Sequence, residues 1–186
     1  MAQMLFGSTV MSPVISKIKI TDKDKYGATI DSFLGDVDEN GVLQAPTKPT
    51  ELNFAGVKRI ASYSLAYCFY KTGITSVDLS SVTTVDGYGL SNAFSGCRSI
   101  TSVVLSSLQS VGANGLYYAF YECRGLTTIS FPSLTSVHTT SFNSAFSYCS
   151  SLTEIHFRAD MQATIETMSG YSSKWGATNA TIYFDL

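Results

Sequence analysis

Apolar residues return in the same order every 26 residues along the middle of this chain. Units begin at Leu65, Leu90, Leu116 and Phe142, and half a unit precedes them at 52–60. The apolar positions of the unit 116–141 are Leu116, Phe120, Leu126, Ile129, Phe131, Leu134 and Val137. The first full unit is one residue shorter than the others. One coil of this length is too thin to bury its own apolar side, so the period predicts stacked coils that share a core.

Each unit contains two runs that alternate like short β-strands. In the first run, alternation places Ile129 and Phe131 toward the core and Thr128 and Ser130 toward solvent. The second run, 134–137, predicts another short extended segment. Repeated along the chain, these runs predict rows of strands on two sides of the stack.

The start of each unit has a different spacing. Leu116 and Phe120 are four residues apart, which predicts one helical turn facing the core. The fold class predicted for the whole chain is a β-rich α/β solenoid, in which right-handed coils over 49–157 carry an N-terminal β cap and a C-terminal helix–strand cap. We expect these parts to form a single folded unit.

The N-terminal cap is predicted to span residues 1–48. Strand-like alternation runs over 10–20, and a second short strand or turn system is expected over 26–37. A tight hairpin is predicted over 35–43, where an Asn-Gly pair supplies the residues that such turns need. The segment 45–50 contains two prolines and leads into the repeats.

The C-terminal cap is predicted to span 158–186. A helix is expected over 158–170, with Gly170 at its C-terminal end. Its core-facing residues follow helical spacing and are Met161, Ile165 and Met168. A final strand is expected over 181–184, and Trp175 is expected to cover the open end of the core.

The repeated segments AFSGCRSITSVVLSSLQSV and AFYECRGLTTISFPSLTSV resemble the BspA-like leucine-rich repeats, whose unit is aFxxCxxLxxIxLPxxLxxI. The resemblance covers residues 50–157 and includes the leucine-rich strand pattern L-x-x-L-x-L. It implies a curved solenoid used for adhesion or recognition, usually by bacterial surface proteins. The family brings no catalytic residues.

Three of the four cysteines, Cys97, Cys123 and Cys149, each follow a phenylalanine by three residues and so occupy one column of the stack. Cys68 aligns instead with the alanine column. We expect four free, buried thiols, although neighbouring strands about 4.8 Å apart would also allow a disulfide. Cysteine–histidine spacing typical of zinc is absent from the sequence, and no metal or cofactor is expected.

Charge is sparse and nearly balanced. The net charge is -2 and 14% of residues are charged, which argues against a nucleic-acid surface. Between 65 and 141 the charged residues are Lys71, Asp78, Asp86, Arg98, Glu122 and Arg124. No apolar run reaches the roughly 20 residues that span a bilayer, so membrane insertion is not expected. The N-terminus lacks the pattern of a secretory signal, yet an extracellular surface or a virion is the favoured location.

Candidate contact residues lie where the units differ. Eight of the 11 tyrosines fall between 63 and 148, and the outward-facing candidates are Tyr67, Tyr70, Tyr117, Tyr118, Tyr121 and Tyr148. Tyrosine beside serine and asparagine is typical of adaptable binding surfaces. The same rings could instead cover the backbone and join neighbouring coils. On the strand side, Glu154 and His156 are expected to share an exposed face with small polar residues.

The chain is predicted to be a non-enzymatic binding or adhesion module whose partner is a protein or glycan on a cell surface. The alternative is a structural decoration or attachment protein of a phage particle or another surface assembly, with copies of itself or particle subunits as partners. Catalysis is not expected, because His138 and His156 lie on different faces of their units and no G-x-S-x-G motif occurs.

Overall fold

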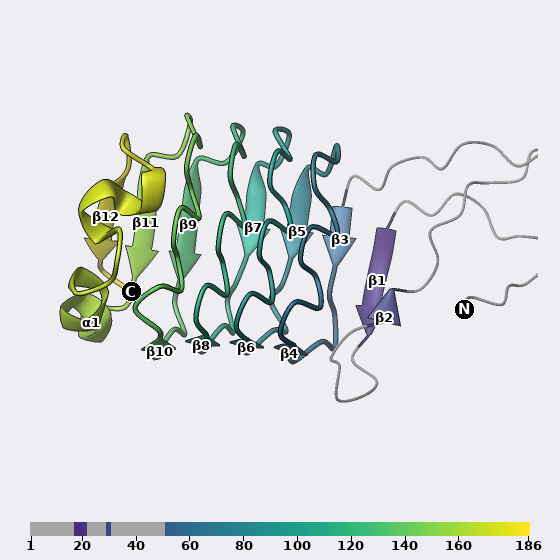
Figure 1. Cartoon of the computed structure of the whole chain (residues 1–186), viewed down its shortest axis with the longest axis horizontal. Helices are drawn as coiled ribbons and strands as arrows, with labels where there is room; N and C mark the ends of the chain where they lie inside the picture. Colours follow the sequence, from purple (N-terminus) through teal and green to yellow (C-terminus); the bar gives the residue numbers. More distant parts are fainter. Residues whose placement is uncertain (1–16, 22–28, 31–50) are drawn as a thin grey trace, which may run out of the picture.

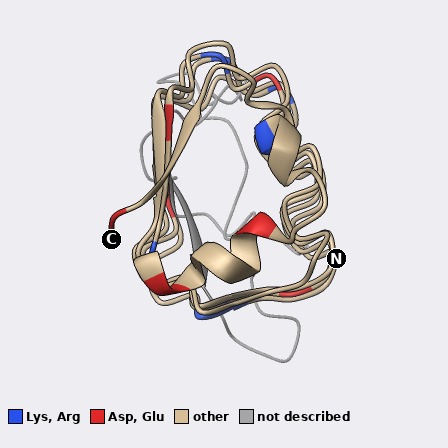
Figure 2. Ribbon diagram, turned by 90° about the vertical axis from the view of Figure 1, so that its left-hand side faces the viewer, with Lys and Arg blue, Asp and Glu red and all other residues tan. Residues whose placement is uncertain are grey.

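The computed structural model of the chain describes residues 17–21, 29–30 and 51–186. The hairpin predicted over 35–43 and the segment 45–50 lie outside these residues. Successive coils stack along one long axis (Figure 1) and nearly superimpose when viewed along it (Figure 2). The repeat period therefore produces the solenoid-like fold that the sequence predicts.

One side of the stack is a row of parallel strands that forms two sheets. Their strand orders are β2-β1-β3-β5-β7 and β12-β11-β9, and only β1 and β2 pair antiparallel. The ladder breaks between β7 and β9, which still lie side by side (Figure 1). The bounds are β1 (Lys17–Thr21), β2 (Thr29–Ile30), β3 (Glu51–Asn53), β5 (Ser76–Asp78), β7 (Ser102–Val104), β9 (Thr128–Phe131), β11 (Glu154–Phe157) and β12 (Thr181–Phe184).

A second row of shorter parallel strands forms another side, in the order β10-β8-β6-β4. These strands are β4 (Arg59–Ile60), β6 (Thr84–Val85), β8 (Ser110–Val111) and β10 (Ser136–Val137). They confirm the second extended segment predicted in each unit. The strands are only two residues long because tight turns flank them, as the bonds from Val82 N to Leu79 O before β6 and from Gly89 N to Asp86 O after it show.

Strand register confirms the repeat period. Ser76 pairs with Ser102, an offset of 26 residues, whereas Glu51 pairs with Ser76, an offset of 25 residues. Within β9, Ile129 and Phe131 are buried while Thr128 is exposed, as alternation predicts. The apolar columns of the sequence therefore become continuous buried columns of the structure.

The helical turn predicted at the start of each unit is wrong. The N–H of Phe120 donates to the carbonyl of Ala145 in the next coil at 3.0 Å, so it is not available to Leu116. The N–H of Ala119 closes a four-residue turn onto the Leu116 carbonyl, also at 3.0 Å. The third residue of that turn, Tyr118, has a φ of +51°, which an α-helix does not allow.

This pattern repeats as a staircase of tight turns along the third side of each coil, which appears as the rippled side in Figure 2. Alternate N–H groups close turns within the coil, and the others donate to the neighbouring coil. No helix forms here because every second N–H group donates to a carbonyl of the adjacent coil instead of to its own coil. The spacing of apolar residues within one unit does not reveal these bonds between coils.

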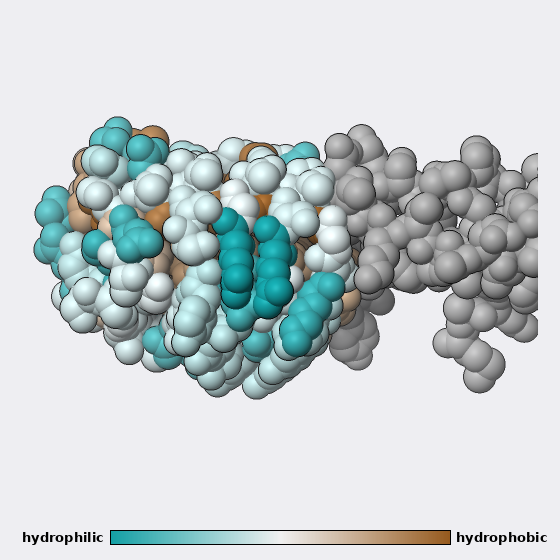
Figure 3. All heavy atoms as spheres, turned by 90° about the horizontal axis from the view of Figure 1, so that it is seen from above, coloured by the Kyte–Doolittle hydropathy of each residue, from teal (hydrophilic) through white to brown (hydrophobic). Residues whose placement is uncertain are grey.

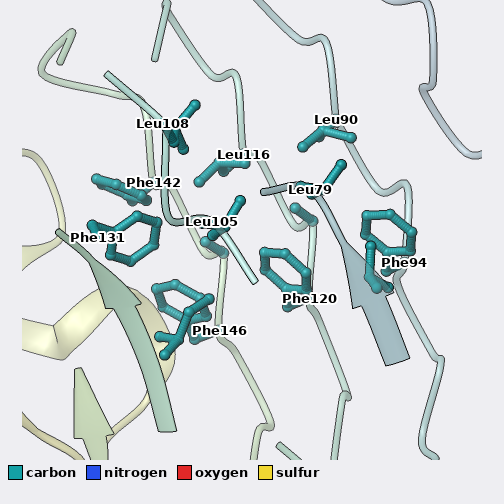
Figure 4. Packing of buried hydrophobic residues seen from close by; sticks show 14 of the residues in the cluster. Leu79, Leu90, Phe94, Leu105, Leu108, Leu116, Phe120, Phe131, Phe142 and Phe146 are labelled. Carbon is teal, nitrogen blue, oxygen red and sulfur yellow. The ribbon is translucent and has the colours of Figure 1, made fainter. Parts of the chain in front are cut away.

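Phenylalanine rings form a stacked column through the core. The centroid separations are 5.5 Å for Phe69 and Phe94, 5.7 Å for Phe94 and Phe120, and 6.0 Å for Phe120 and Phe146, and neighbouring rings tilt by 10° or less. Figure 4 shows three of these rings in a row, beside a second row formed by Leu90, Leu116 and Phe142. Both columns are fully buried apart from slight exposure at Phe69.

The cysteine column is confirmed as free and buried, and each thiol has a polar partner. The Sγ atoms of Cys97, Cys123 and Cys149 donate to the carbonyls of the phenylalanines one coil back, at 2.9 to 3.3 Å. Cys68 is also free but exposed, which corrects the prediction of four buried thiols. Cys68 lies outside the cysteine column. In its coil Thr72 occupies the column position instead, and Thr72 Oγ1 lies 3.2 Å from Cys97 Sγ.

After β11 the chain leaves the repeat through short helical elements. They are η1 (Ala159–Met161), α1 (Gln162–Glu166) and η2 (Tyr171–Gly176). Met161, Ile165 and Met168 are buried as predicted, but the α-helix ends at Glu166, well before Gly170. The last strand, β12, has the predicted bounds and pairs with β11.

Trp175 packs against the final coil. Its ring lies 5.2 Å from that of Phe142 and 5.9 Å from that of Phe157, and only 1% of its surface is exposed. The indole Nε1 donates to the carbonyl of Ser169 at 3.0 Å. The burial predicted for this residue is confirmed, and its single polar group is satisfied.

Candidate functional site

The staircase of turns carries most of the tyrosines. Tyr67 and Tyr118 adopt left-handed backbone conformations with φ of 60° and 51°, which are uncommon for residues other than glycine. Hydrogen bonds to the next coil hold both, from Tyr67 N to Ser91 O at 3.0 Å and from Tyr118 N to Asn143 O at 3.2 Å. The tyrosines therefore stand on a backbone that is tied to the next coil, and local strain of this kind often accompanies a functional surface.

An open hollow of about 380 Å³ lies among these tyrosines. We call it the tyrosine hollow, and its lining residues are Tyr67, Tyr70, Asn92, Ser95, Tyr117, Tyr118 and Tyr121. They come from three consecutive coils. The first and third coils supply tyrosines as walls, while the middle coil supplies only Asn92 and Ser95. The hollow exists because the middle coil has small side chains where both neighbours have rings.

The walls are clusters of rings in contact. In the third coil, Tyr118 lies edge-on to Tyr117 at 4.5 Å and to Tyr121 at 5.4 Å. In the first coil, Tyr67 and Tyr70 lie 6.1 Å apart, also edge to face. Edge-to-face contacts between aromatic rings stabilise their arrangement beyond the effect of burial alone. The rings of each wall therefore hold one another in place without a bound partner.

The middle coil supplies the polar floor. Ser95 is only 3% exposed, and no residue within 51–186 forms a hydrogen bond with its hydroxyl group. Asn92 Nδ2 donates to Ser91 Oγ at 3.1 Å, which orients the amide. Ser91 and Ser95 are both buried, although Ser95 shares a column with the outward-facing Tyr70 and Tyr121. The Ser95 hydroxyl is thus a buried polar group in the floor of an open hollow.

The charged residues near the hollow include one carboxylate that is paired with two arginines. Glu122 lies between Arg98, at 2.6 Å, and Arg124, at 3.7 Å. The hydrogen bond from Arg98 is the main reason that the pKa of Glu122 is lowered. Lys71 Nζ lies 4.8 Å from the centre of the Tyr70 ring, a cation–π contact. None of the lining residues is charged.

Two tyrosine hydroxyls of the third coil, those of Tyr117 and Tyr121, remain protonated. Burial by neighbouring side chains is the main cause that raises the pKa of Tyr117 and of Tyr121. Each hydroxyl can therefore donate and accept a hydrogen bond near neutral pH. Charged residues are also scattered thinly along the ribbon in Figure 2, and strongly hydrophilic residues form only small groups in the view of Figure 3. The site is polar and uncharged.

A second polar cluster lies on the outer face of the strand row. His156 Nδ1 lies 2.9 Å from Asp185 Oδ1, and Nε2 lies 3.5 Å from Glu154 Oε2. The imidazole stacks on the Tyr183 ring at 4.9 Å. Burial by itself lowers the pKa of His156, but the hydrogen bonds that the ring donates to Asp185 and Glu154, together with the charges of these carboxylates, outweigh it and raise the pKa.

The structure brings five of the predicted contact residues together in the tyrosine hollow: Tyr67, Tyr70, Tyr117, Tyr118 and Tyr121. Tyr148 is exposed and lies outside it, with its ring 5.2 Å from that of Tyr121. Glu154 and His156 are together, as expected of residues on one face, but they lie on the strand row rather than on the staircase. The eight candidates therefore form two separate groups.

Sequence reasoning missed four residues of these groups. Asn92 and Ser95 could have been found from the columns, because a small residue between two tyrosines of neighbouring coils leaves a gap. Asp185 and Tyr183 had no such signal, since they follow the repeats and reach His156 only through the pairing of β12 with β11.

Within the described ranges, no group of three or more acidic, histidine or cysteine side chains could hold a metal ion. Helices of that same part of the chain are all too short or too polar to cross a membrane. Both statements concern residues 17–21, 29–30 and 51–186 alone.

Comparison with known proteins identifies one family. The model of the BspA type leucine-rich repeat region matches residues 58–174 in six copies. A comparison with curated proteins found no match. The matched family is a non-enzymatic repeat family of the protein-binding or adhesion type, and the match covers the coils that form the tyrosine hollow. This chain belongs to the BspA-type leucine-rich repeat family.

Proposed function

We propose that the chain attaches to a protein or glycan on a cell surface, and that the tyrosine hollow is the centre of the contact. The observation that supports this most is the hollow itself, in which two ring walls enclose a polar floor. Its volume falls within the range of about 300 to 1,000 Å³ that small-molecule and side-chain sites occupy. Exposed rings at its rim extend the surface that a partner can cover, since Tyr67 is 59% and Tyr70 is 44% exposed.

Rigidity makes this surface suitable for binding. A flexible loop must lose conformational freedom when a partner binds, at a cost of about 0.5 to 1.5 kcal/mol for each ordered side chain. The rings of the tyrosine hollow already restrain one another, and the turns beneath them are tied to the next coil. Most of the contact energy therefore remains available for affinity.

Cell binding by labelled protein tests this proposal. The variant Tyr67→Ala/Tyr70→Ala/Tyr121→Ala removes rings from both walls, and we expect it to bind a panel of whole bacterial cells at least tenfold more weakly than the unaltered chain. The matched control is Tyr63→Ala/Tyr183→Ala, which removes two exposed tyrosines outside the hollow. Equal binding by the wall variant and the unaltered chain would refute the proposal.

A second candidate function is structural, as a decoration or attachment protein of a phage particle or another surface assembly. The supporting observation is that Tyr63, Tyr67, Tyr70 and Tyr148 are all more than two-fifths exposed along the staircase. A neighbouring subunit would bury these rings. Sedimentation analysis distinguishes this role, because it requires self-association that the alanine variants weaken.

We also propose that residues 1–48 and 158–186 act as caps of the array. At the C-terminal end, the support is the burial of Trp175 and Met161 against the last coil. Solenoid ends need such cover, because the outer face of a terminal coil is otherwise apolar. A chain that ends at 157 should lose solubility and bind a hydrophobic dye, whereas unchanged behaviour would exclude the cap.

A further inference from the structure

The tyrosine hollow lies where the middle of three consecutive coils has a serine and both of its neighbours have a tyrosine ring. Tyr70, Ser95 and Tyr121 occupy equivalent positions in three consecutive coils, as the backbone bonds from Lys71 N to Ser95 O and from Gly96 N to Tyr121 O show. Where tyrosines of adjacent coils do meet, their ring centroids lie about one coil apart, at 5.0 Å for Tyr63 and Tyr88. Ser95 interrupts such a series.

The width of this gap limits what can enter. Two coil steps of about 4.8 Å each separate the first and third coils by roughly 10 Å. Ring-sized groups contact an aromatic ring at centroid distances of about 4.5 to 7 Å. One ring between the walls can therefore contact both of them, whereas two layers cannot fit.

The lining offers no charge to an ionic ligand and disfavours purely apolar ones. None of the lining residues is charged, and the neighbouring carboxylate of Glu122 is already paired with Arg98, so a charged group inside the hollow would find no counter-charge on its walls or floor. An apolar ring would cover the Ser95 hydroxyl and leave it without a hydrogen bond, which buried polar groups rarely tolerate. A neutral ring that carries hydroxyl groups satisfies both conditions.

We propose that the tyrosine hollow is a subsite for a single neutral pyranose ring of a glycan. The weakly positive C–H face of the sugar packs against the electron-rich faces of the tyrosine rings. Its hydroxyls exchange hydrogen bonds with Ser95 Oγ, the Asn92 amide and the tyrosine hydroxyls. This proposal rests on the proposed function, in which the same surface attaches to a cell, and it specifies the chemistry recognised there.

Titration of the full chain with methyl pyranosides of glucose, galactose, mannose and N-acetylglucosamine tests the subsite. The readout is the set of tyrosine ring signals in NMR spectra. We expect at least one sugar to cause saturable shifts, with a millimolar dissociation constant typical of a single small ring. Tyr67, Tyr70 and Tyr121 should shift, whereas Tyr183 on the strand row should not.

Filling the gap gives the sharpest variant. Ser95→Tyr supplies the missing ring at a position where both neighbouring coils already have tyrosine, and we expect it to weaken pyranoside binding at least tenfold. Tyr63→Ala is the control, because Tyr63 is 63% exposed and does not line the hollow. Tyr70→Ala and Tyr121→Ala provide the same test by removing a wall, should Ser95→Tyr fail to fold.

The outcomes separate this inference from the proposed function. Absence of saturable shifts with every pyranoside, while the unaltered chain still binds cells, would overturn the sugar subsite alone. Undiminished pyranoside binding by folded Ser95→Tyr, or by both wall variants, would also overturn it. Saturable pyranoside binding that these variants lose would support it, even if no cell in the panel were bound.

Discussion

The phenyl rings of Phe94 and Phe120 lie 5.7 Å apart and tilt by only 10° from parallel, so each coil contributes one ring to a continuous core column. Phe146 continues the column on the other side of Phe120 at 6.0 Å. Phe120 is fully buried and therefore contacts core residues of the coils before and after its own. Stability of neighbouring coils is coupled through this side chain.

Phe120→Ala should reduce the free energy of unfolding by about 3 to 5 kcal/mol, because it removes a buried ring and leaves a cavity between two coils. Urea denaturation followed by circular dichroism measures this loss. Tyr63→Ala is the control, since its ring is mostly exposed, and its effect should remain below about 1 kcal/mol. A loss under about 1 kcal/mol for Phe120→Ala would contradict the packing of the column.

Thiol reactivity should distinguish Cys68 from the other cysteines. Burial is the main cause that raises the pKa of the Cys123 thiol and that raises the pKa of Cys149 to about 12. These buried thiols should stay protonated and unreactive in the native protein. A chromogenic disulfide reagent should modify one thiol per native chain and all four after denaturation.

The single native reaction should be slow at neutral pH, because partial burial also raises the pKa of Cys68. Its rate should increase as the pH rises toward that pKa, since the thiolate is the reacting form. Cys68→Ser should abolish the native reaction. Modification of a second thiol without loss of structure would show that the cysteine column is more accessible than the fold indicates.

The pH dependence of stability should report on His156. Its pKa is raised in the folded chain, so folding favours the protonated imidazole between Asp185 and Glu154. The resulting stabilisation is fully present below the unfolded pKa of about 6.5 and is lost as the pH rises through the folded value. Thermal unfolding should therefore begin at lower temperature at pH 8 than at pH 6.

Asp185→Asn removes one charged partner and should bring the NMR titration midpoint of His156 down while flattening the pH dependence of unfolding. The control is His138→Gln, because the imidazole of His138 bonds only to Thr140 among the described residues and lies apart from this cluster. An unchanged His156 midpoint in Asp185→Asn would show that the 2.9 Å contact does not hold the proton.

Gly176 should be intolerant of any side chain. Its φ is +96°, and an added Cβ would overlap Ser147 Oγ and lie 2.6 Å from Ser147 Cα. We expect Gly176→Ala to cost about 2 to 4 kcal/mol, from backbone strain and overpacking together. Thermal and urea denaturation measure the loss.

Two other glycines separate the causes of that loss. Gly56 has a positive φ of 87° but open space around it, so Gly56→Ala should show strain alone, about 1 kcal/mol. Gly73 has open space and an ordinary φ, and Gly73→Ala should change stability by less than about 0.5 kcal/mol or increase it slightly. A Gly176→Ala cost no greater than that of Gly56→Ala would mean that Ser147 yields to the methyl group.

The sequence by itself determined the repeat, the strands and the buried columns. Stacked coils present the same position to the same neighbour, so one apolar pattern read along the chain fixes which residues of every coil face inward. Ile129, Phe131 and the cysteine column illustrate this, as does the pairing of Ser76 with Ser102. These features depend on local alternation and period, which a linear pattern contains.

Only the tertiary structure decided how the rest of each coil is built. The N–H of Phe120 bonds to Ala145 of the next coil, and this contact between coils converts a predicted helical turn into a staircase of turns. Cys68 is exposed because it falls beside the cysteine column rather than in it. The partners of His156 come from β12, beyond the repeat.

The tyrosine hollow depends partly on the sequence pattern and partly on the tertiary structure. Its tyrosines stood out in the sequence, but their arrangement as two walls around Ser95 depends on which coils are adjacent and how deeply the small residue is covered. The pattern within one coil predicts whether a side chain faces the core or the surface. The space beside that side chain depends on residues about 25 positions away in the chain, as Tyr70, Ser95 and Tyr121 illustrate. That space exists only once the coils have stacked.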